Sequence, residues 1–457
     1  MSTPDPQTTP DATGPTDLGP TRPTNVRWLV FVLGCGTSWL LYIHRYAFAL
    51  VKSDIGREFN LDAGELANLD VWFQVFYGGV QIPAGILVDL VGAHLFLSAS
   101  IAVWSVGLAL HAFPPHYSLL LAGRILLASG QAAVFAALGW LTRKWFPPQV
   151  RTTVQGWLGV FFARFGGASA NFLIGTLLIG AIGLAWHNAL LLLAALGGLL
   201  ACVFYALVRN QPNDHSWANQ AEADLVTAGQ AAVNQQPVSA RDLAHSLFVI
   251  RSRGDALVTL NVLLLCLAAG MSTVADALYS SWLPYFLREV HGLEYKEMGF
   301  YSSLPLIGGA LGGVLGGFIN DWAWRRRPGS RWVRAVIGCV GKGLAVGLLL
   351  LALTQYQNPY TFCWLLFPVK IAADISLATR WGAITDIGAR YTASLFAIVN
   401  AVAIVAGIIG AKLYGYLIPL DVADAAQWKG VFYFVTGAYA LCALFWLCVD
   451  SRKTLDR

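Results

Sequence analysis

The chain has 457 residues, of which 56% are hydrophobic and 12% are charged, and that charged fraction is about half that of an average soluble domain. This composition argues against a soluble enzyme. The net charge of +5 does not indicate a nucleic-acid binder, because the Lys and Arg residues fall between apolar runs, as the positive-inside rule requires of a membrane protein.

The N-terminal residues 1–26 are rich in Pro and Thr and lack an apolar core with a cleavage site, so we expect a disordered tail and not a signal peptide. The rest of the chain alternates apolar runs near the ~20 residues that cross a bilayer with short polar breaks. We predict an all-α membrane protein with twelve transmembrane helices near 28–50, 66–88, 95–112, 117–141, 152–176, 186–208, 257–287, 297–319, 333–354, 360–384, 391–417 and 430–449.

The one long polar stretch, residues 209–255, separates six predicted spans from the next six. We therefore predict a six-helix bundle over 27–208, a cytoplasmic linker over 209–255, a second bundle over 256–449 and a tail over 450–457. Cations crowd alternate loops, including Arg143 and Lys144 and the run from Arg325 to Arg334, which places both termini in the cytoplasm.

The two halves repeat short strings at matching places. Gly85 to Asp89 closes the second span and Gly317 to Asp321 closes the eighth, both as G-x-x-x-D. Parallel repeats of this kind are typical of one large class of transporters.

The seven cysteines lie apart in apolar stretches, without a CxxC pair or a Cys/His pairing. We expect free thiols, no metal site and no cofactor. They are Cys35, Cys202, Cys266, Cys339, Cys363, Cys442 and Cys448.

Several motifs resemble the major facilitator superfamily, and within it the anion:cation symporter family of sugar-acid and hexuronate permeases. The similarity covers residues 28–449 and rests on these stretches: Gln81-Ile-Pro-Ala-Gly85 with Asp89 and Gly92, Trp145-Phe146-Pro147 through Arg151, Trp282-Leu283-Pro284, Glu297-Met298-Gly299, and Asp386 through Tyr391 leading to Asn400. The resemblance implies a multi-pass carrier of the plasma (inner) membrane, a monomer that moves a small organic anion by alternating access, with a proton or another cation coupled to it.

The chain departs from the family pattern at the positions that usually carry charge. The family tends to have Asp-Arg in the first span and an acidic residue below an arginine in the fourth, whereas this chain has His44-Arg45 and the neutral Gln131 after Arg124. The basic residues that usually follow Asp89 in the 2–3 loop are also missing. The customary coupling carboxylates are therefore absent from both spans.

Charges within the hydrocarbon are costly and usually functional. By depth, Arg45 and Arg124 could face one cavity and bind a carboxylate bidentately. Ser38 and Tyr42 share a helix face with Arg45, and Gln131 shares one with Arg124, so they could recognise a polyol chain, and the resemblance adds Asn400. Alternatively, Arg124 caps a helix end or snorkels outward.

Proton coupling would then need other titratable groups, and we single out His44, the lone carboxylate Asp276, and Asp374. Asp374 could equally form an intrahelical ion pair with Lys370, one turn away. Arg164 could contact substrate or pair structurally. Without proton coupling the carrier would be a uniporter, an exchanger or sodium-coupled.

A cytoplasmic gate is expected where the repeated strings end. The candidates are Gly85, Asp89, Gly92, Arg151, Asp321 and Arg390. Each carboxylate could latch onto a helix N-terminus or a cation and release it on switching. The alternative is that the two aspartates are ordinary polar residues of helix-ending turns.

The prediction is thus a secondary active transporter of a sugar acid or related carboxylate. The alternatives are a transport-inactive sensor on the same scaffold, or a carrier of phosphorylated or other anionic metabolites. A membrane-embedded enzyme is disfavoured because the sequence has no metal-ligand spacing, nucleophile elbow or phosphate-binding Gly loop.

Overall fold

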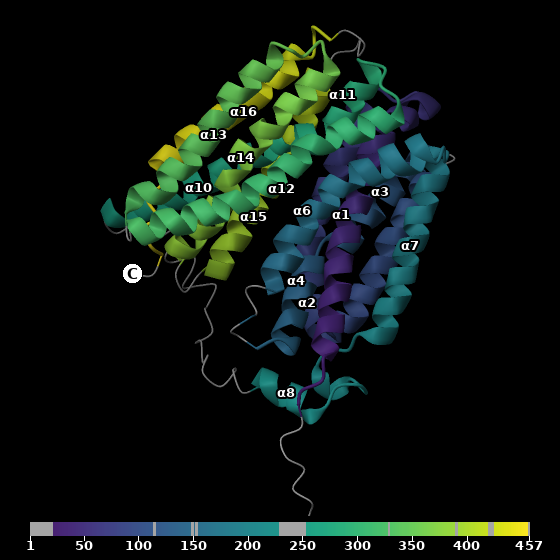
Figure 1. Ribbon diagram of the computed structural model, residues 1–457, viewed down its shortest axis with the longest axis vertical. Coiled ribbons are helices and arrows are strands. Elements are labelled where there is room, and N and C mark those ends of the chain that lie inside the picture. The colour runs from purple at the N-terminus through teal and green to yellow at the C-terminus, as the bar shows by residue number, and fades with distance from the viewer. Residues whose placement is uncertain are drawn as a thin grey trace, which may run out of the picture.

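The computed structural model is all-helical and describes residues 22–112, 116–147, 150, 154–227, 253–327, 330–388, 392–418 and 425–455. Figure 1 shows two groups of long helices side by side, one built from the first half of the chain and one from the second. The two ends of the molecule are named here after the short helices α11 (Leu283–Glu289) and α8 (Gln220–Thr227), which lie at opposite ends in that view.

The first bundle contains the helices up to the linker. Its segments are α1 (Val26–Phe59), α2 (Ala63–Ala112), α3 (Tyr117–Gln131), α4 (Val134–Trp145), the π-helical η1 (Trp157–Phe161), α6 (Phe162–Ala170), the π-helical η2 (Asn171–Ala181) and α7 (Trp186–Leu207). Within α2, Gly92 has a φ of 78°, which breaks the helix into two parts. Glycine suits this position because other residues avoid positive φ, and a Cβ there would also meet the side chain of Asn210.

The second bundle repeats the pattern of long apolar helices. Its segments are α10 (Arg253–Ala277), the π-helical η4 (Leu278–Trp282), α11, α12 (Tyr295–Arg326), α13 (Arg331–Leu353), α14 (Pro359–Gly388), α15 (Thr392–Leu417) and α16 (Lys429–Cys448). Between the bundles, the short turn η3 (Pro212–Asp214) and α8 begin the linker.

Among the described residues, eleven helices are long and apolar enough to cross a membrane. Eleven of the twelve predicted spans therefore have a counterpart, and the segment 66–88 is helical within α2 but is not one of the eleven. The predicted end of the first span at residue 50 is wrong, because α1 continues to Phe59. Lys52, expected in a loop, is consequently a fully buried helical residue.

The two bundles contact each other mainly in the half of the molecule toward α11 (Figure 1). There η2 packs on α12 so closely that a Cβ on Gly175 would lie 2.8 Å from the Cα of Gly299. Asn171 donates a hydrogen bond to Ser302 across the same contact, and Arg57 of α1 pairs with Glu289 of α11 at 2.6 Å. Small residues thus allow the backbones to approach, as in other membrane helix pairs.

The start of the linker is docked on the first bundle. Glu222 of α8 is fully buried and accepts hydrogen bonds from the backbone N–H and the side chain of Arg27, both at the first turn of α1. Its other carboxylate oxygen accepts from the hydroxyl of Thr24. A carboxylate at a helix N-terminus satisfies backbone donors that have no partner within the helix.

Candidate functional site

A buried ion triad lies within the first bundle. Asp70 of α2 accepts hydrogen bonds from Lys52 at 2.8 Å and from Arg124 of α3 at 2.6 Å, through separate carboxylate oxygens. Lys52 is 0% exposed and Arg124 is 4% exposed. The amine of Lys52 also lies 3.8 Å from the ring centroid of Trp282, which belongs to the second bundle. Two cations therefore share one carboxylate beside the interface between the bundles.

Arg45 of α1 sits next to this triad and has no carboxylate partner among the described residues. Its Nε donates to the amide oxygen of Gln131 at 3.0 Å, and its Nη2 is buried without a hydrogen-bond partner. The guanidinium lies 4.5 Å from the ring centroid of Tyr77 and 5.5 Å from that of Phe73. Arg124 lies 4.6 Å from the same Phe73 ring, so the two predicted arginines converge on one side chain.

A second cluster of ion pairs joins the two bundles within their membrane spans. Lys370 of α14 donates to Asp276 at 2.6 Å and to Asp374 at 2.9 Å. Arg164 of α6, in the first bundle, pairs with Asp374 at 3.4 Å. The side chains of Arg164 and Asp276 are 29% and 30% exposed, although both residues lie well inside the candidate membrane spans Val154–Ala181 and Gly254–Glu289. Their contacts with groups of the other elements place them at the interface and not on the outer surface of the bundles.

Two further cations of the second bundle lie within electrostatic reach of Asp276. Lys342 of α13 donates to the hydroxyl of Ser272 at 2.9 Å and lies over the ring of Tyr439. Arg380 of α14 interacts electrostatically with Asp276 and with Arg164. Neither cation bonds to a carboxylate among the described residues.

These charged side chains form what we call the interior charge cluster. It consists of Arg45, Lys52, Asp70, Arg124, Arg164, Asp276, Lys342, Lys370, Asp374 and Arg380. Seven cations face three carboxylates, which leaves an excess of four positive charges. Because each charge inside a membrane protein costs about 2.5–3.5 kcal/mol on insertion scales, an uncompensated excess of this size favours a site that receives an anion.

The other predicted binding residues are distributed unevenly around this cluster. Tyr42 is half-buried with its ring centroid 5.0 Å from the guanidinium of Arg45. Gln131 orients Arg45 and anchors its own amide on the carbonyl of Leu41. Ser38 is turned away, because its hydroxyl donates to the carbonyl of Leu158 at 2.5 Å. Asn400 is exposed on α15.

The three proton-coupling candidates have different surroundings. His44 is fully buried on the face of α1 that meets α7, where a Cβ on Gly197 would lie 2.8 Å from its ring. Asp276 is not a lone carboxylate, because α14 brings Lys370 against it. Asp374 forms the anticipated intrahelical pair with Lys370 and a second, interbundle pair with Arg164.

The predicted cytoplasmic gate is only partly visible. Arg151 and Arg390 lie outside the described residues, and the side chains of Asp89 and Asp321 are likewise not described. Gly85 is half-buried in α2 and has open space around it, and Gly92 forms the turn described above. The gate therefore remains a prediction.

Sequence reasoning missed Lys52, Asp70 and Arg380. Asp70 falls inside the predicted span 66–88, and Arg380 inside 360–384, so the rule that intramembrane charges mark function would have found both. Lys52 lies seven residues after Arg45, two helical turns along the same face. Extending the first helix past residue 50 would have placed it with Arg45.

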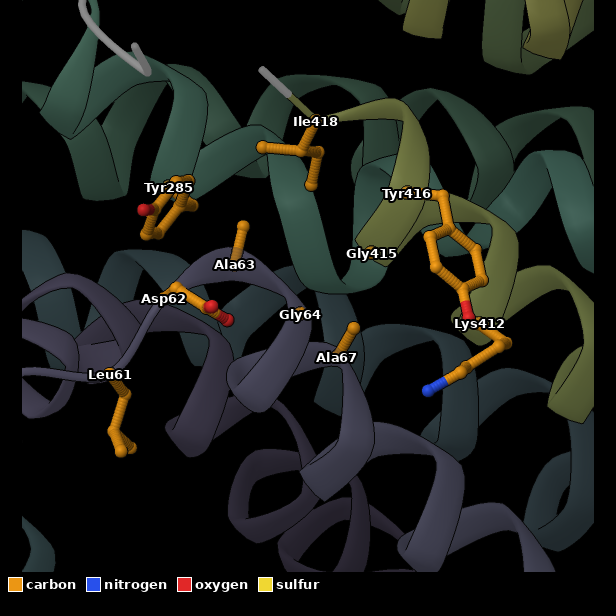
Figure 2. A pocket seen from close by; sticks show the side chains of 10 residues that line it. All are labelled: Leu61, Asp62, Ala63, Gly64, Ala67, Tyr285, Lys412, Gly415, Tyr416 and Ile418. Atoms are coloured by element: carbon orange, nitrogen blue, oxygen red, sulfur yellow. The ribbon is translucent and has the colours of Figure 1, made fainter. Parts of the chain in front are cut away.

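A separate cavity of about 370 Å³ opens at the α11 end, between the start of α2 and the end of α15. Figure 2 shows Asp62, Tyr285, Lys412 and Tyr416 around it. Lys412 donates to Asn68 at 2.9 Å across the two bundles. No member of the interior charge cluster lines this cavity.

Two bundles of membrane-length helices that share a buried, predominantly cationic cluster define a polytopic membrane protein of the secondary-transporter type. Residues 34–411 match the family model of the Major Facilitator Superfamily, and the chain belongs to that superfamily. The predicted family resemblance is confirmed at this level.

Curated relatives refine the comparison. The chain is 26% identical to a probable sulfoacetate transporter of Cupriavidus necator, over 86% of this chain and 87% of that protein. It is 24% identical to a probable galactarate/D-glucarate transporter of Bacillus subtilis, over 93% and 91% of the two chains. A probable L-galactonate transporter of Escherichia coli is 23% identical over 82% and 80%.

Among solved structures, the fold is similar to that of a bacterial homologue of the human lysosomal transporter Spinster, crystallised in an inward-facing and unoccupied conformation. The TM-score is 0.71 at 17% sequence identity, and the match covers 94% of this chain and 98% of the other. This similarity supports the helical architecture.

Proposed function

We propose that this protein carries a small organic anion, a sugar acid or a related carboxylate or sulfonate, across the plasma (inner) membrane. The observation that carries the proposal is the excess positive charge of the interior charge cluster, together with Arg45, whose guanidinium has no carboxylate partner in the part of the chain that the structure describes. A guanidinium presents paired N–H donors that match an acid group, and it stays charged at any physiological pH. The substrates after which the three curated relatives are named are all organic acids.

Transport is proposed to proceed by alternating access of the two bundles. The contacts between Arg57 and Glu289 and between Asn171 and Ser302 hold the α11 end together. Cations such as Arg143, Lys144 and Arg452 lie at the opposite end, and the positive-inside rule assigns that end to the cytoplasm with both termini. The described arrangement would then be the one that receives substrate from the cytoplasmic side.

Arg45→Gln is the direct test of the site. Uptake of radiolabelled galactarate, L-galactonate and sulfoacetate into proteoliposomes is measured for the unchanged protein, for Arg45→Gln and for Lys144→Gln. Lys144 is an exposed cation outside the cluster, so its variant serves as the matched control. Loss of about 1.5–3 kcal/mol of charged hydrogen bonding predicts a roughly 10- to 150-fold weaker apparent affinity for Arg45→Gln alone.

Equal loss in both variants, or no loss in either, would refute the assignment of the site. Binding of the acids without uptake would instead indicate a transport-inactive sensor on the same scaffold. Ligand-induced thermal stabilisation, measured on the same preparations, reports binding separately from uptake and so distinguishes a sensor from a carrier.

The proposal assigns coupling to a cation to the carboxylates of the second bundle. Asp276 and Asp374 both pair with Lys370, and Asp374 also pairs with Arg164, so protonation of either carboxylate would release Lys370 or Arg164 from an ion pair. We expect uptake driven by a pH gradient to be lost in Asp276→Asn or Asp374→Asn and kept in His44→Ala, because His44 faces α7. Retained pH-gradient-driven uptake in all three variants would refute the assignment of coupling to these residues. A lack of response of the unchanged protein to a pH gradient would instead indicate a uniporter, an exchanger or a sodium-coupled carrier.

A further inference from the structure

Several guanidinium groups of the interior charge cluster have unused hydrogen-bond donors, including Nη1 of the buried Arg124. Two of these groups, Arg45 and Arg164, come from the neighbouring segments α1 and α6. Arg45 uses its Nε on Gln131 and leaves Nη2 without a partner. Arg164 makes one ion pair, through Nη1 to Asp374, although a guanidinium has five N–H donors. Its side chain is also 29% exposed, so a ligand can reach it. This inference rests on the proposed function and concerns the kind of anion that is carried.

The offset between the two arginines follows from the packing of α1 against η1 and α6. The contacts advance in the same direction along both segments, because Gly34 lies against Leu158 and Tyr42 lies against Gly166. Arg45 is three residues beyond Tyr42, and Arg164 is two residues before Gly166. Five residues correspond to about 7.5 Å along parallel helices. Both side chains lean toward their own helix N-termini, so the offset persists at the guanidinium groups.

Two phenol side chains interact with both arginines. Tyr42 and Tyr46, one turn apart on α1, each interact electrostatically with both Arg45 and Arg164. Their ring centroids are 6.3 Å apart. Hydroxyl groups at this place can bond to the hydroxyls of a polyol chain that runs from one arginine to the other.

The excess charge is also divided into two equal parts. Around Arg45, the cations Lys52 and Arg124 share only Asp70, which leaves an excess of two positive charges. Around Arg164 lie three cations and two carboxylates of the second bundle, so that four positive charges, including Arg164 itself, face two negative ones and again leave an excess of two. These five groups are Lys342, Lys370, Arg380, Asp276 and Asp374. A ligand with a single acid group would compensate only one of the two centres.

We propose that the substrate is a short-chain dianion, a dicarboxylate or a sulfocarboxylate, with one acid group bound by Arg45 and the other by Arg164. Tyr42 and Tyr46 contact the chain between the acid groups. In this role Arg164 is a specificity-determining residue that distinguishes a diacid from a monoacid of the same length. The curated relatives do not decide the point, since galactarate and sulfoacetate carry two acid groups and L-galactonate carries one.

The test uses matched ligand pairs that differ in one acid group. The purified full-length protein is titrated with galactarate against L-galactonate, succinate against butyrate, and sulfoacetate against acetate, and affinities are obtained from thermal stabilisation and from inhibition of proteoliposome uptake. We expect the best-binding acid to be a dianion that binds about tenfold or more tightly than its monoanionic partner. This comparison needs no variant and so does not depend on the folding of a mutant.

The same titrations on Arg164→Gln assign the second acid group. The variant should lose the preference for the dianion while its affinity for the monoanion changes less than about twofold, and Arg45→Gln should weaken both ligands. If Arg164 served only to pair with Asp374, Asp374→Asn would reproduce every effect of Arg164→Gln, and the role of Arg164 would be overturned. A monoanion that binds the unchanged protein as tightly as its dianion would overturn the dianion inference and leave organic-anion transport standing. If none of the acids binds, both proposals fall.

Discussion

Asp70 offers the sharpest test of how the interior charges stabilise one another. Its carboxylate is the shared partner of Lys52 and Arg124, and all three side chains are at most 9% exposed. Asp70→Asn keeps the volume of the side chain and removes its charge. Two buried cations then lie next to each other without a carboxylate, one of them over Trp282 at the bundle interface.

The magnitude follows from the burial of the triad. Removing one partner of a buried ion pair costs about 3–5 kcal/mol, because it leaves a charge without compensation in a medium of low dielectric constant. Solvent does not screen this interaction and does not reduce the expected loss, since Lys52 is 0% exposed. We expect the free energy of unfolding of Asp70→Asn to fall by that amount. The double variant Lys52→Met/Asp70→Asn should recover part of the loss, because only Arg124 then remains without a carboxylate.

Unfolding can be followed by intrinsic fluorescence of the 17 Trp residues during titration of SDS into mixed micelles. Glu294→Gln is the control, since Glu294 is an exposed carboxylate outside the cluster. An unfolding midpoint of Asp70→Asn equal to that of the control would refute the reasoning. A double variant less stable than the single variant would show that Lys52 stabilises the fold by contacts other than Asp70.

Three further predictions concern the ends of the molecule. Gly175→Val should hold η2 away from α12 and open the α11 end. Gly198→Val should not have this effect, because the space around Gly198 is open. The difference is measured as the chemical accessibility of cysteines introduced at the α11 end. Glu222→Gln should lower the free energy of unfolding by about 1–3 kcal/mol, because the carboxylate is buried on Arg27, and an unchanged melting curve would contradict this. Arg57→Ala should lower the free energy of unfolding by less than about 1 kcal/mol, since 55% of that side chain is exposed. A larger decrease in the SDS titration would show that the ion pair of Arg57 with Glu289 is stronger than its exposure implies.

The sequence predicted the helical class well because apolar length is a local property. Eleven predicted spans have counterparts among the eleven membrane-length helices, and the long polar stretch fell where α8 begins the linker. Helix ends were less certain, as the extension of α1 to Phe59 shows. The family was also accessible, since short motifs such as Trp282-Leu283-Pro284 are read directly from the chain.

Individual charges inside the membrane could be predicted from the sequence, but their partners could not. Composition and depth pointed to Arg45 and Arg124 as charges inside the membrane, whereas the contact of Arg124 with Asp70 depends on how α2 packs against α3. The same holds for Asp276, which looked isolated along its helix until α14 brought Lys370 to 2.6 Å.

The sequence by itself determined that this chain crosses a membrane many times and that it keeps cations inside, because hydropathy and charge are carried by single residues. The tertiary structure decided which of those cations are already neutralised. Ion pairing requires two groups within about 4 Å, and here the partners come from helices that are 54 residues apart for Arg124 and Asp70 and 210 residues apart for Arg164 and Asp374. Only packing brings such groups together, and only packing shows that Arg45 pairs with Gln131 and with no carboxylate among the described residues.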